Sequence, residues 1–378
     1  MKAIKKPELT KVPFIGELAL SGVRPIVGIA LGLLAGGVLI ALSGVNPFTA
    51  YKAMLQGAFG SLHAFSNVLV RSSPLLLGGV GVALGIKAGV WNTGIEGYMY
   101  LGAIGAAVVG IPELPLPPVV HITLSLIVAM VFGAAWGLIP GYLRAYRGVN
   151  EVTSTIMLNY VAIFLTSWLV ADPQPLAEIG AFYPMSKLIQ KSAQLPILMR
   201  GTSLHPGAFI GLVVCALLHF VLRYTPFGFR TRMLGANPNA ARYSGINTSR
   251  QIILVIMIGA MLGGLAGAIE VIGLKRRVYM EFVTGVGYES VAVALLAGGN
   301  PLGVIAAALF FSSLKAGGAT MSIQTGIGAP MSSVIIALCV LFVIGVGVSE
   351  RRRVEKVHDN ENPEAINAPK TEDKDNDA

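Results

Sequence analysis

The stretch "RTRMLGANPNAARYSGINTSR", Arg230 to Arg250, separates two long apolar segments at roughly 207–224 and 250–273. It carries four arginines, an Asn-Pro turn and a run of small residues compatible with a short helix. A plain loop between two membrane spans needs basic residues on the side where positive charge collects, but it needs no small-residue helix. We therefore expect the chain to cross the membrane on both sides of this stretch and to dock the short helix into a groove on another protein.

The composition is that of a membrane protein. Hydrophobic residues make up 54% of the 378 residues and charged residues only 12%, with a mean hydropathy of +0.70. Soluble domains carry about 25% charged residues, so most of this surface cannot face water. The apolar runs are continuous over about 20 residues rather than alternating, which excludes a transmembrane β-barrel. The sequence predicts an all-α polytopic membrane protein.

The net charge of +9 does not point to nucleic acid, because the basic residues cluster at the ends of apolar segments. That distribution is typical of membrane proteins that obey the positive-inside rule. Cys215 and Cys339 both lie inside apolar runs, where cysteine behaves as a small buried hydrophobe. We expect no disulfide, no metal site and no cofactor.

About ten apolar segments divide the chain, and the loop charges between them set an orientation. Basic residues at Arg144, Arg147 and 351–353 fall on the same side as Arg230–Arg250 and the N-terminus, so both termini are expected in the cytoplasm. The predicted domains are a basic N-terminus (1–24), a transmembrane domain (25–350) and a disordered tail (351–378). The segments are roughly 25–43, 67–87, 93–110, 119–143, 153–171, 207–224, 250–273, 286–298, 301–319 and 330–349.

One basic cluster disagrees with this orientation. Lys275–Arg277 falls on the outer side, together with a long proline-containing loop at 172–206. Either this cluster lines the outer end of a cavity, or the segments 286–298 and 301–319 are half-helices. The residues leave both alternatives open.

The segment "AGVWNTGIEGYMYLGAIGAA", 88–107, places polar side chains inside an apolar region. Asn92 and Glu96 are one helical turn apart and share a face if this part is helical. A buried acid in lipid is costly and normally faces a cavity or a partner, so Glu96 either lines a path or bonds a neighbouring helix. A second interruption, "LLAGGNPLG", lies in the other half of the chain, and such pairs can mark an inverted repeat with a midplane site.

The segment "GVNEVTSTIMLNYVAIFL", 148–165, begins with Asn150 and Glu151 after a basic pair. A capping acid at a helix N-terminus is sufficient to explain Glu151. Asn159 lies deeper in the helix, where an amide needs a partner. The residues do not distinguish a cavity from an interhelical bond for Asn159.

These motifs carry a family resemblance over roughly 25–350. "NTGIEGYMYLGA", "STIMLNYVA", "GANPNAARYSGIN" and "GYESVAVALLAGGNPLGVIAAALFFSSL" occur in an order that resembles the permease subunits of bacterial ABC importers for simple sugars and nucleosides. The resemblance implies a multi-pass subunit of the bacterial plasma membrane that pairs with a second permease, couples to cytosolic ATPase subunits and receives substrate from an extracellular binding protein. It implies that the segment 235–247 enters a groove on the ATPase, through Gly235, Asn237, Ala240, Ala241, Arg242 and Gly245.

The form "NTGIEG" resembles the nucleoside branch, which is typically paired with a lipoprotein receptor, rather than the ribose branch. Tyr98 stands where that pattern usually has Gln, which puts one polar contact in question. The long loop at 172–206 resembles the longer of two paralogous permeases and implies a heterodimer. Purine nucleosides are the expected cargo, and ribose or another simple sugar is the alternative.

The expected mechanism is alternating access driven by ATP hydrolysis on separate subunits, so the chain itself is not expected to be an enzyme. A stand-alone proton-coupled transporter is the main rival, with Glu96, Glu270 or Glu289 as the titrating acid. A membrane scaffold that transports nothing is the second rival. Residues that could hydrogen-bond a nucleoside or stack on its base along the path are Asn92, Glu96, Asn159, Tyr288, Glu289 and Asn300.

Overall fold

The computed structural model describes residues 14–328 and 330–361, and over this part the chain is helical, with two isolated β-bridges and no strand. It divides into two compact units, one of residues up to Val38 together with those from Val334, the other Leu39–Ser333. In the first unit, α1 (Phe14–Leu42) lies against α13 (Met331–Glu361). The backbone of Gly32 there packs directly on Cys339, so this pair of helices requires a residue without a side chain.

All ten apolar segments expected from the sequence fall on helices of the described residues. Six are long and apolar enough to cross a membrane, and a seventh is possible if α1 and α2 (Pro47–Phe59), which meet at 118°, form one bent span. The chain is therefore a multi-pass membrane protein, but ten full crossings are not confirmed. The six are α3 (Leu62–Lys87), α5 (Pro118–Arg147), α6 (Glu151–Leu169), α7 (Gly207–Tyr224), α12 (Pro301–Thr325) and α10 (Thr248–Ile269) with its extension to Lys275.

Asn-Pro pairs begin several helices. Asn46, Asn237 and Asn300 each accept a hydrogen bond from a backbone N–H in the first turn of α2, α9 (Pro238–Tyr243) and α12, respectively. Proline follows at the first helical position, where its missing N–H costs nothing. The Asn oxygen satisfies one of the free N–H groups there.

Two helices begin inside the second unit instead of at its ends. Residues 88–94 are not helical, and α4 (Ile95–Gly110) starts only after them. Residues 276–285 likewise form turns before α11 (Val286–Leu296). At 1.5 Å per residue, the 11 residues of α11 are about 16 Å long, roughly half a bilayer. Of the two segments that the sequence left open as half-helices, α11 has the length of a half-helix, whereas α12 has 25 residues and is long enough to span.

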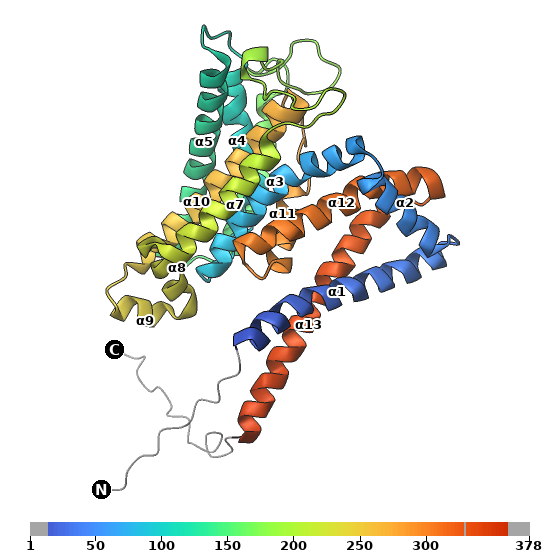
Figure 1. The fold of residues 1–378 in the computed structure, drawn as a ribbon. Coiled ribbons are helices and arrows are strands. Elements are labelled where there is room, and N and C mark those ends of the chain that lie inside the picture. Colours follow the sequence, from blue (N-terminus) through green and yellow to red (C-terminus); the bar gives the residue numbers. More distant parts are fainter. Residues whose placement is uncertain (1–13, 329, 362–378) are drawn as a thin grey trace. The chain divides into compact units, whose positions relative to one another are not determined.

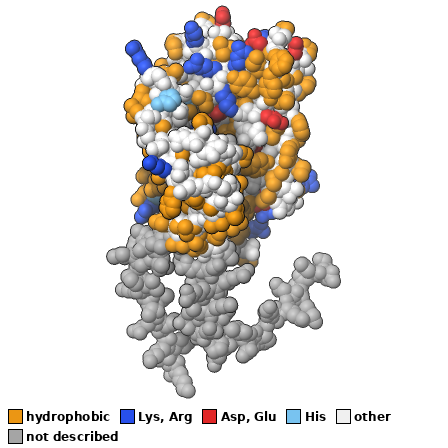
Figure 2. Space-filling view, turned by 90° about the vertical axis from the view of Figure 1, so that its right-hand side faces the viewer, with side chains coloured by type: hydrophobic (Ala, Val, Ile, Leu, Met, Phe, Trp, Pro, Cys, Tyr) orange, Lys and Arg blue, Asp and Glu red, His pale blue; other side chains and the backbone are white. Residues whose placement is uncertain are grey.

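The opposite ends of the second unit carry different features (Figure 1). We call the end that holds α9 and α8 (Pro226–Ala236) the α9 end, and the end that holds the 172–206 loop the loop end. Arg277 forms an ion pair of 3.4 Å with Glu178 of that loop. Lys275 pairs with Glu270 at 3.5 Å. The basic cluster Lys275–Arg277 therefore lies at the loop end, held by acids of the same chain, and Figure 2 shows charged side chains of both signs at this end.

The termini differ from the sequence prediction. The helix α1 begins at Phe14 rather than near residue 25, and α13 continues to Glu361 through residues expected to be disordered. Six of the seven residues at 350–356 are Arg, Glu or Lys, which are good helix formers, so a helix can continue there without an apolar face. The rest of the predicted tail, and residues 1–13, lie outside the described residues.

The core of the second unit is built on α10, which packs against α5, α4 and α3. Glycines bring these backbones together. Gly102 of α4 lies directly on the backbone of Gly264, and a Cβ on Gly81 of α3 would lie 2.9 Å from the carbonyl oxygen of Gly259. Close backbone approach through small residues is how helices associate in lipid, where burial of apolar side chains drives little.

We predict that Gly102→Ala destabilises the protein, because the new methyl group would overlap the Gly264 backbone. Overpacking of this kind costs about 1–3 kcal/mol and should lower the thermal unfolding temperature in detergent by several degrees. Gly345→Ala is the matched control, since a Cβ there meets no atom within 4 Å. Equal unfolding temperatures for the two variants would contradict the tight α4–α10 crossing.

Candidate functional site

The Glu96 carboxylate joins the two helices that begin inside the unit. Glu96 lies in the first turn of α4 and is only 1% exposed. One carboxylate oxygen accepts the N–H of Gly285 at 2.7 Å, and the other accepts the N–H of Gly287 at 2.6 Å. These groups open α11, where free N–H groups and the helix dipole favour a negative charge. We call this contact the α4–α11 junction.

Asn92 supports the non-helical entry to α4. Its side-chain oxygen accepts the N–H of Gly94 at 3.2 Å and the hydroxyl of Tyr98 at 3.0 Å. Tyr98 departs from the family pattern at this position, and its hydroxyl makes a polar contact here. Asn92 is 2% exposed, and its side-chain nitrogen has no hydrogen-bond partner among the described residues.

Asn159 connects α6 to the same region. Its side-chain oxygen accepts the N–H of Gly97 at 2.9 Å, and its nitrogen donates to the carbonyl of Thr93 at 3.0 Å and to the hydroxyl of Tyr288 at 3.3 Å. Of the residues named from the sequence, the structure thus brings Asn92, Glu96, Asn159 and Tyr288 together around the start of α4. The first three are buried by protein, and their hydrogen bonds are made within the chain.

Tyr288 and Glu289 differ from these three because they reach the surface. Tyr288 is 40% exposed. Glu289 forms a close ion pair with Lys315 of α12, with 2.6 Å between the Lys nitrogen and the nearer carboxylate oxygen. The two side chains remain 23% and 25% exposed, respectively. Asn300 lies apart from the group as the N-cap of α12, next to Gly299, which packs against Ile86 near the α9 end of α3.

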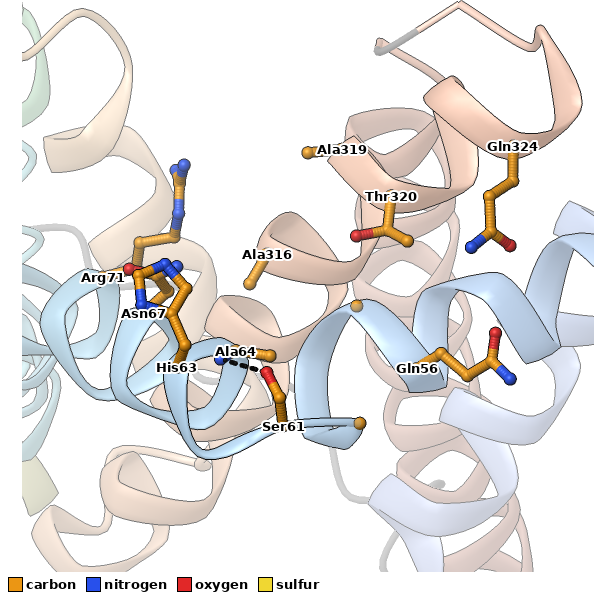
Figure 3. A pocket seen from close by; sticks show the side chains of 12 residues that line it. Gln56, Ser61, His63, Ala64, Asn67, Arg71, Ala316, Ala319, Thr320 and Gln324 are labelled. Carbon is orange, nitrogen blue, oxygen red and sulfur yellow. Dashed lines mark hydrogen bonds between the residues drawn. The ribbon is translucent and has the colours of Figure 1, made fainter. Parts of the chain in front are cut away.

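A polar pocket of about 620 Å³ opens on the same unit between α2, α3 and α12. Figure 3 shows the side chains of these three helices around it. The lining is mostly amides, hydroxyls and small residues, and no acidic side chain is among the described residues that line it. The pocket residues are Gln56, Gly57, Gly60, Ser61, His63, Ala64, Asn67, Arg71, Ala316, Ala319, Thr320 and Gln324.

Arg71 shows that this face does not meet lipid. It is exposed, and it lies about 14 Å along α3 from Leu62 and about 24 Å from Lys87, at 1.5 Å per residue. An arginine placed that deep in a bilayer costs about 3 kcal/mol on insertion scales. This face must therefore meet water or another protein.

The pocket was not identified from the sequence. Arg71 is the one charged residue between 67 and 86, inside the expected apolar segment 67–87. A lone intramembrane charge is a functional signal by itself, and it could have identified the pocket. Lys315 is one helical turn before Ala319 on α12, so the Glu289–Lys315 pair adjoins the pocket lining.

Glu151 has more partners than a helix-capping acid. Asn150 is the N-cap of α6 and accepts the N–H groups of Val152 and Thr153. Glu151 pairs with Arg144 of α5 at 3.1 Å and accepts the N–H of Trp91 at 3.1 Å. It therefore ties α5 and α6 to the non-helical segment that enters α4.

The predicted docking segment consists of α8 and α9. On α9, Ala240, Arg242 and Tyr243 are exposed, and Tyr243 is 92% exposed, whereas Ala241 is fully buried. Ala240 and Arg242 are thus free to contact another protein, and Ala241 anchors the helix.

Three of the predicted docking residues set the backbone conformation and packing of this segment: Gly235, Asn237 and Gly245. Gly235 packs on the backbone at Lys87 and lies close to Gly89. Asn237 caps α9, and Gly245 has a φ of 78°, which favours glycine. The docking segment therefore lies directly against the loop between α3 and α4.

Known transport permeases resemble this chain over most of its length. The chain is 33% identical to the guanosine ABC transporter permease protein NupP of Bacillus subtilis, over 84% of this chain and 92% of the relative. It is 30% identical to the nucleoside ABC transporter permease protein NupB of Lactococcus lactis, over 84% and 89%, respectively. It is also 30% identical to the glucose ABC transporter permease protein TsgB13 of Haloferax volcanii, over 87% and 89%.

The family match covers most of the second unit and reaches into α13. Residues 64–344, from the start of α3 to α13, match the family described as branched-chain amino acid transport system / permease component. This range includes the α4–α11 junction, most of the pocket lining and the docking segment. The chain belongs to this family of transport permeases.

Proposed function

We propose that this chain is a membrane subunit of an ATP-binding-cassette importer and forms part of the path by which nucleosides, purine nucleosides first, enter the cell. The observation that carries the proposal is the 33% identity to a guanosine permease along nearly the whole length of both chains. The pocket supports it, because amides and hydroxyls with few charges suit a neutral, polar cargo. A volume of about 620 Å³ lies within the range of small-molecule sites, about 300–1,000 Å³.

A simple sugar is the second candidate. The identity of 30% to a glucose permease favours it, and the pocket hydroxyls and amides could also bind sugar hydroxyls. The proton-coupled alternative is disfavoured by the hydrogen bonds of Glu96, which hold both carboxylate oxygens on backbone N–H groups. Proton transport through Glu96 would require this carboxylate to give up one of these bonds in each cycle.

The residues of the expected path have separate tasks in this proposal. Tyr288 and Glu289 form part of its wall, since both are partly exposed beside Lys315. Asn92, Glu96 and Asn159 lie behind that wall and hold the entries to α4 and α11 in place. Asn300 fixes the start of α12, whose other half lines the pocket.

Force reaches the subunit through the docking segment. Ala240 and Arg242 contact a cytosolic ATPase subunit, which hydrolyses the ATP. The α9 end and both termini then face the cytoplasm, and the loop end faces an extracellular binding lipoprotein. In this orientation α4 and α11 are half-crossings that lie toward opposite sides of the membrane, and they account for two of the apolar segments that are too short to be full spans.

A second, paralogous permease completes the membrane part. Two relatives from Lactococcus lactis, NupB and NupC, are 30% and 27% identical to this chain, and two from Bacillus subtilis, NupP and NupQ, are 33% and 27% identical. In each organism, one permease resembles this chain more than the other does. A heterodimer with a chain of the less similar kind is therefore proposed over a homodimer.

We predict ATP-dependent nucleoside uptake by proteoliposomes that contain this chain, the paralogous permease, the ATPase and the receptor. Uptake of tritiated guanosine should require ATP inside the vesicles and should persist with a protonophore. A panel of nucleosides, ribose and glucose identifies the cargo. Uptake by this chain alone, or its loss with the protonophore, would contradict the proposal, and uptake of sugars without nucleosides would favour the second candidate.

We predict that Ala240→Trp lowers both uptake and transport-stimulated ATP hydrolysis at least about tenfold, because the indole would block close docking of an exposed face of α9. Ser203→Trp, at an exposed position of the loop end, is the control and should leave ATPase binding unchanged. Ala240 is preferred over Gly245, whose positive φ would itself strain a substitution. Normal coupling in Ala240→Trp would count against a tightly docked helix.

We predict that Glu96→Gln lowers thermal stability, since an amide offers one acceptor oxygen where two N–H groups need partners. An unpaired buried N–H costs about 1–3 kcal/mol, so unfolding in detergent should occur several degrees lower, with little change in the KM for guanosine. Glu113→Gln, at an exposed position, is the control. A changed KM at unchanged stability would instead place Glu96 in contact with the cargo.

A further inference from the structure

Arg71 is a cation without a hydrogen-bonding partner in the pocket. Its guanidinium makes no hydrogen bond or ion pair with the described residues. Glu270 interacts electrostatically with Arg71 but forms no ion pair with it, and instead pairs with Lys275 at 3.5 Å. The five N–H donors of the guanidinium therefore remain available to a ligand.

The surroundings of Arg71 are neutral and polar. Asn67 lies one turn before it on α3, and Figure 3 shows both side chains at one side of the pocket. Thr320 and Gln324 of α12 and Gln56 of α2 line the remainder. A positively charged cargo is disfavoured here, because the one cation of the pocket has no acid beside it among the lining residues. Cargo that presents hydrogen-bond acceptors to the guanidinium is favoured.

Purine bases differ in the hydrogen-bond donors and acceptors that they present to a guanidinium group. Guanine and hypoxanthine carry two adjacent acceptors, O6 and N7, and the planar guanidinium matches this pair with two parallel N–H bonds. Adenine replaces O6 with an amino donor, which would face the donors of the guanidinium. The neutral amide of Gln or Asn suits adenine instead, through N6 and N7.

We infer that Arg71 selects 6-oxopurine nucleosides, such as guanosine and inosine, over adenosine by a bidentate contact with O6 and N7. This inference rests on the proposed function, because it assumes that nucleosides enter the pocket. It adds a specificity-determining residue in the membrane subunit, downstream of whatever selection the receptor makes. This contact with the base also explains why the membrane-spanning helix α3 contains a charged residue.

The first test needs no substitution. Guanosine, 7-deazaguanosine and adenosine are titrated into the purified ATPase–permease complex without the receptor, so that only the membrane pocket discriminates. Guanosine should bind about tenfold or more tightly than either analogue, because one good bidentate pair gives about tenfold or greater discrimination. Equal binding of guanosine and 7-deazaguanosine, or no binding of guanosine by a complex that transports it, would overturn the inference.

The second test assigns the contact to Arg71. In Arg71→Gln, the preference for guanosine over 7-deazaguanosine should vanish and adenosine should bind as well as or better than guanosine. Arg71→Lys keeps the charge without the fork and should retain only part of the preference. Arg200→Gln, an exposed arginine of the 172–206 loop, is the control with wild-type ratios. A parallel loss for all three ligands in Arg71→Gln would overturn the inference.

Three further outcomes separate this inference from the proposed function. Tighter binding of inosine 5′-monophosphate than of inosine would show that Arg71 serves a phosphate, which overturns the selection of the base. If the complete transporter takes up no nucleoside, the proposed function itself is contradicted. Uptake of guanosine and adenosine at equal rates, with equal binding in the membrane pocket, would remove only the inference.

Discussion

The structure of the second unit depends on a carboxylate placed where a helix begins inside the protein. α11 starts inside the unit, where the N–H group of Gly287 in its first turn is buried and that of Gly285 is partly buried. Unpaired N–H groups in such a place cost several kcal/mol in total. Glu96 supplies both carboxylate oxygens to Gly285 and Gly287. This carboxylate therefore stabilises the breaks before α4 and α11 together.

The junction also connects parts that are distant in the sequence. Residues 88–94 contact the docking segment through Gly89 and Gly235, contact α6 through the bond of Trp91 to Glu151, and lead directly into the first turn of α4. On the other side of the junction, α11 carries Tyr288 and Glu289 to the surface next to the polar pocket. The segment 88–94 thus contacts α8 directly through Gly235 and reaches Tyr288 of α11 through Asn159, which bonds both Thr93 and Tyr288.

Sequence reasoning succeeded where the physical signal is local. Continuous apolar runs identified ten helices, because burial of apolar groups in lipid needs no knowledge of the fold. An Asn-Pro pair and small residues predicted a short helix between two apolar segments, and α9 lies within the range expected. Asn92 and Glu96 both lie at the entry to α4, but Asn92 precedes the helix, so the shared helical face that their spacing suggested is not formed. The helix α2 was missed, since its 13 residues are too few and too polar to read as a span.

The functions of the polar residues could not be read in the same way, because they depend on partners far along the chain. The partners of Glu96 are 189 and 191 residues away. Nothing local in the sequence distinguishes such a cap from a cargo contact. The pocket combines α2, α3 and α12, whose pairing follows from close contacts such as that between Gly57 and Thr320. The sequence shows Arg71 as a lone charge in an apolar segment. It does not show that residues of α2 and α12 form a pocket with it.

The most direct test is an experimental structure of the assembled transporter with guanosine bound. The account predicts density for the nucleoside in the pocket of α2, α3 and α12, with the base within hydrogen-bond distance of Arg71. It also predicts that Glu96 still accepts the N–H groups of Gly285 and Gly287. A nucleoside in contact with the Glu96 carboxylate, with α11 uncapped, would contradict it.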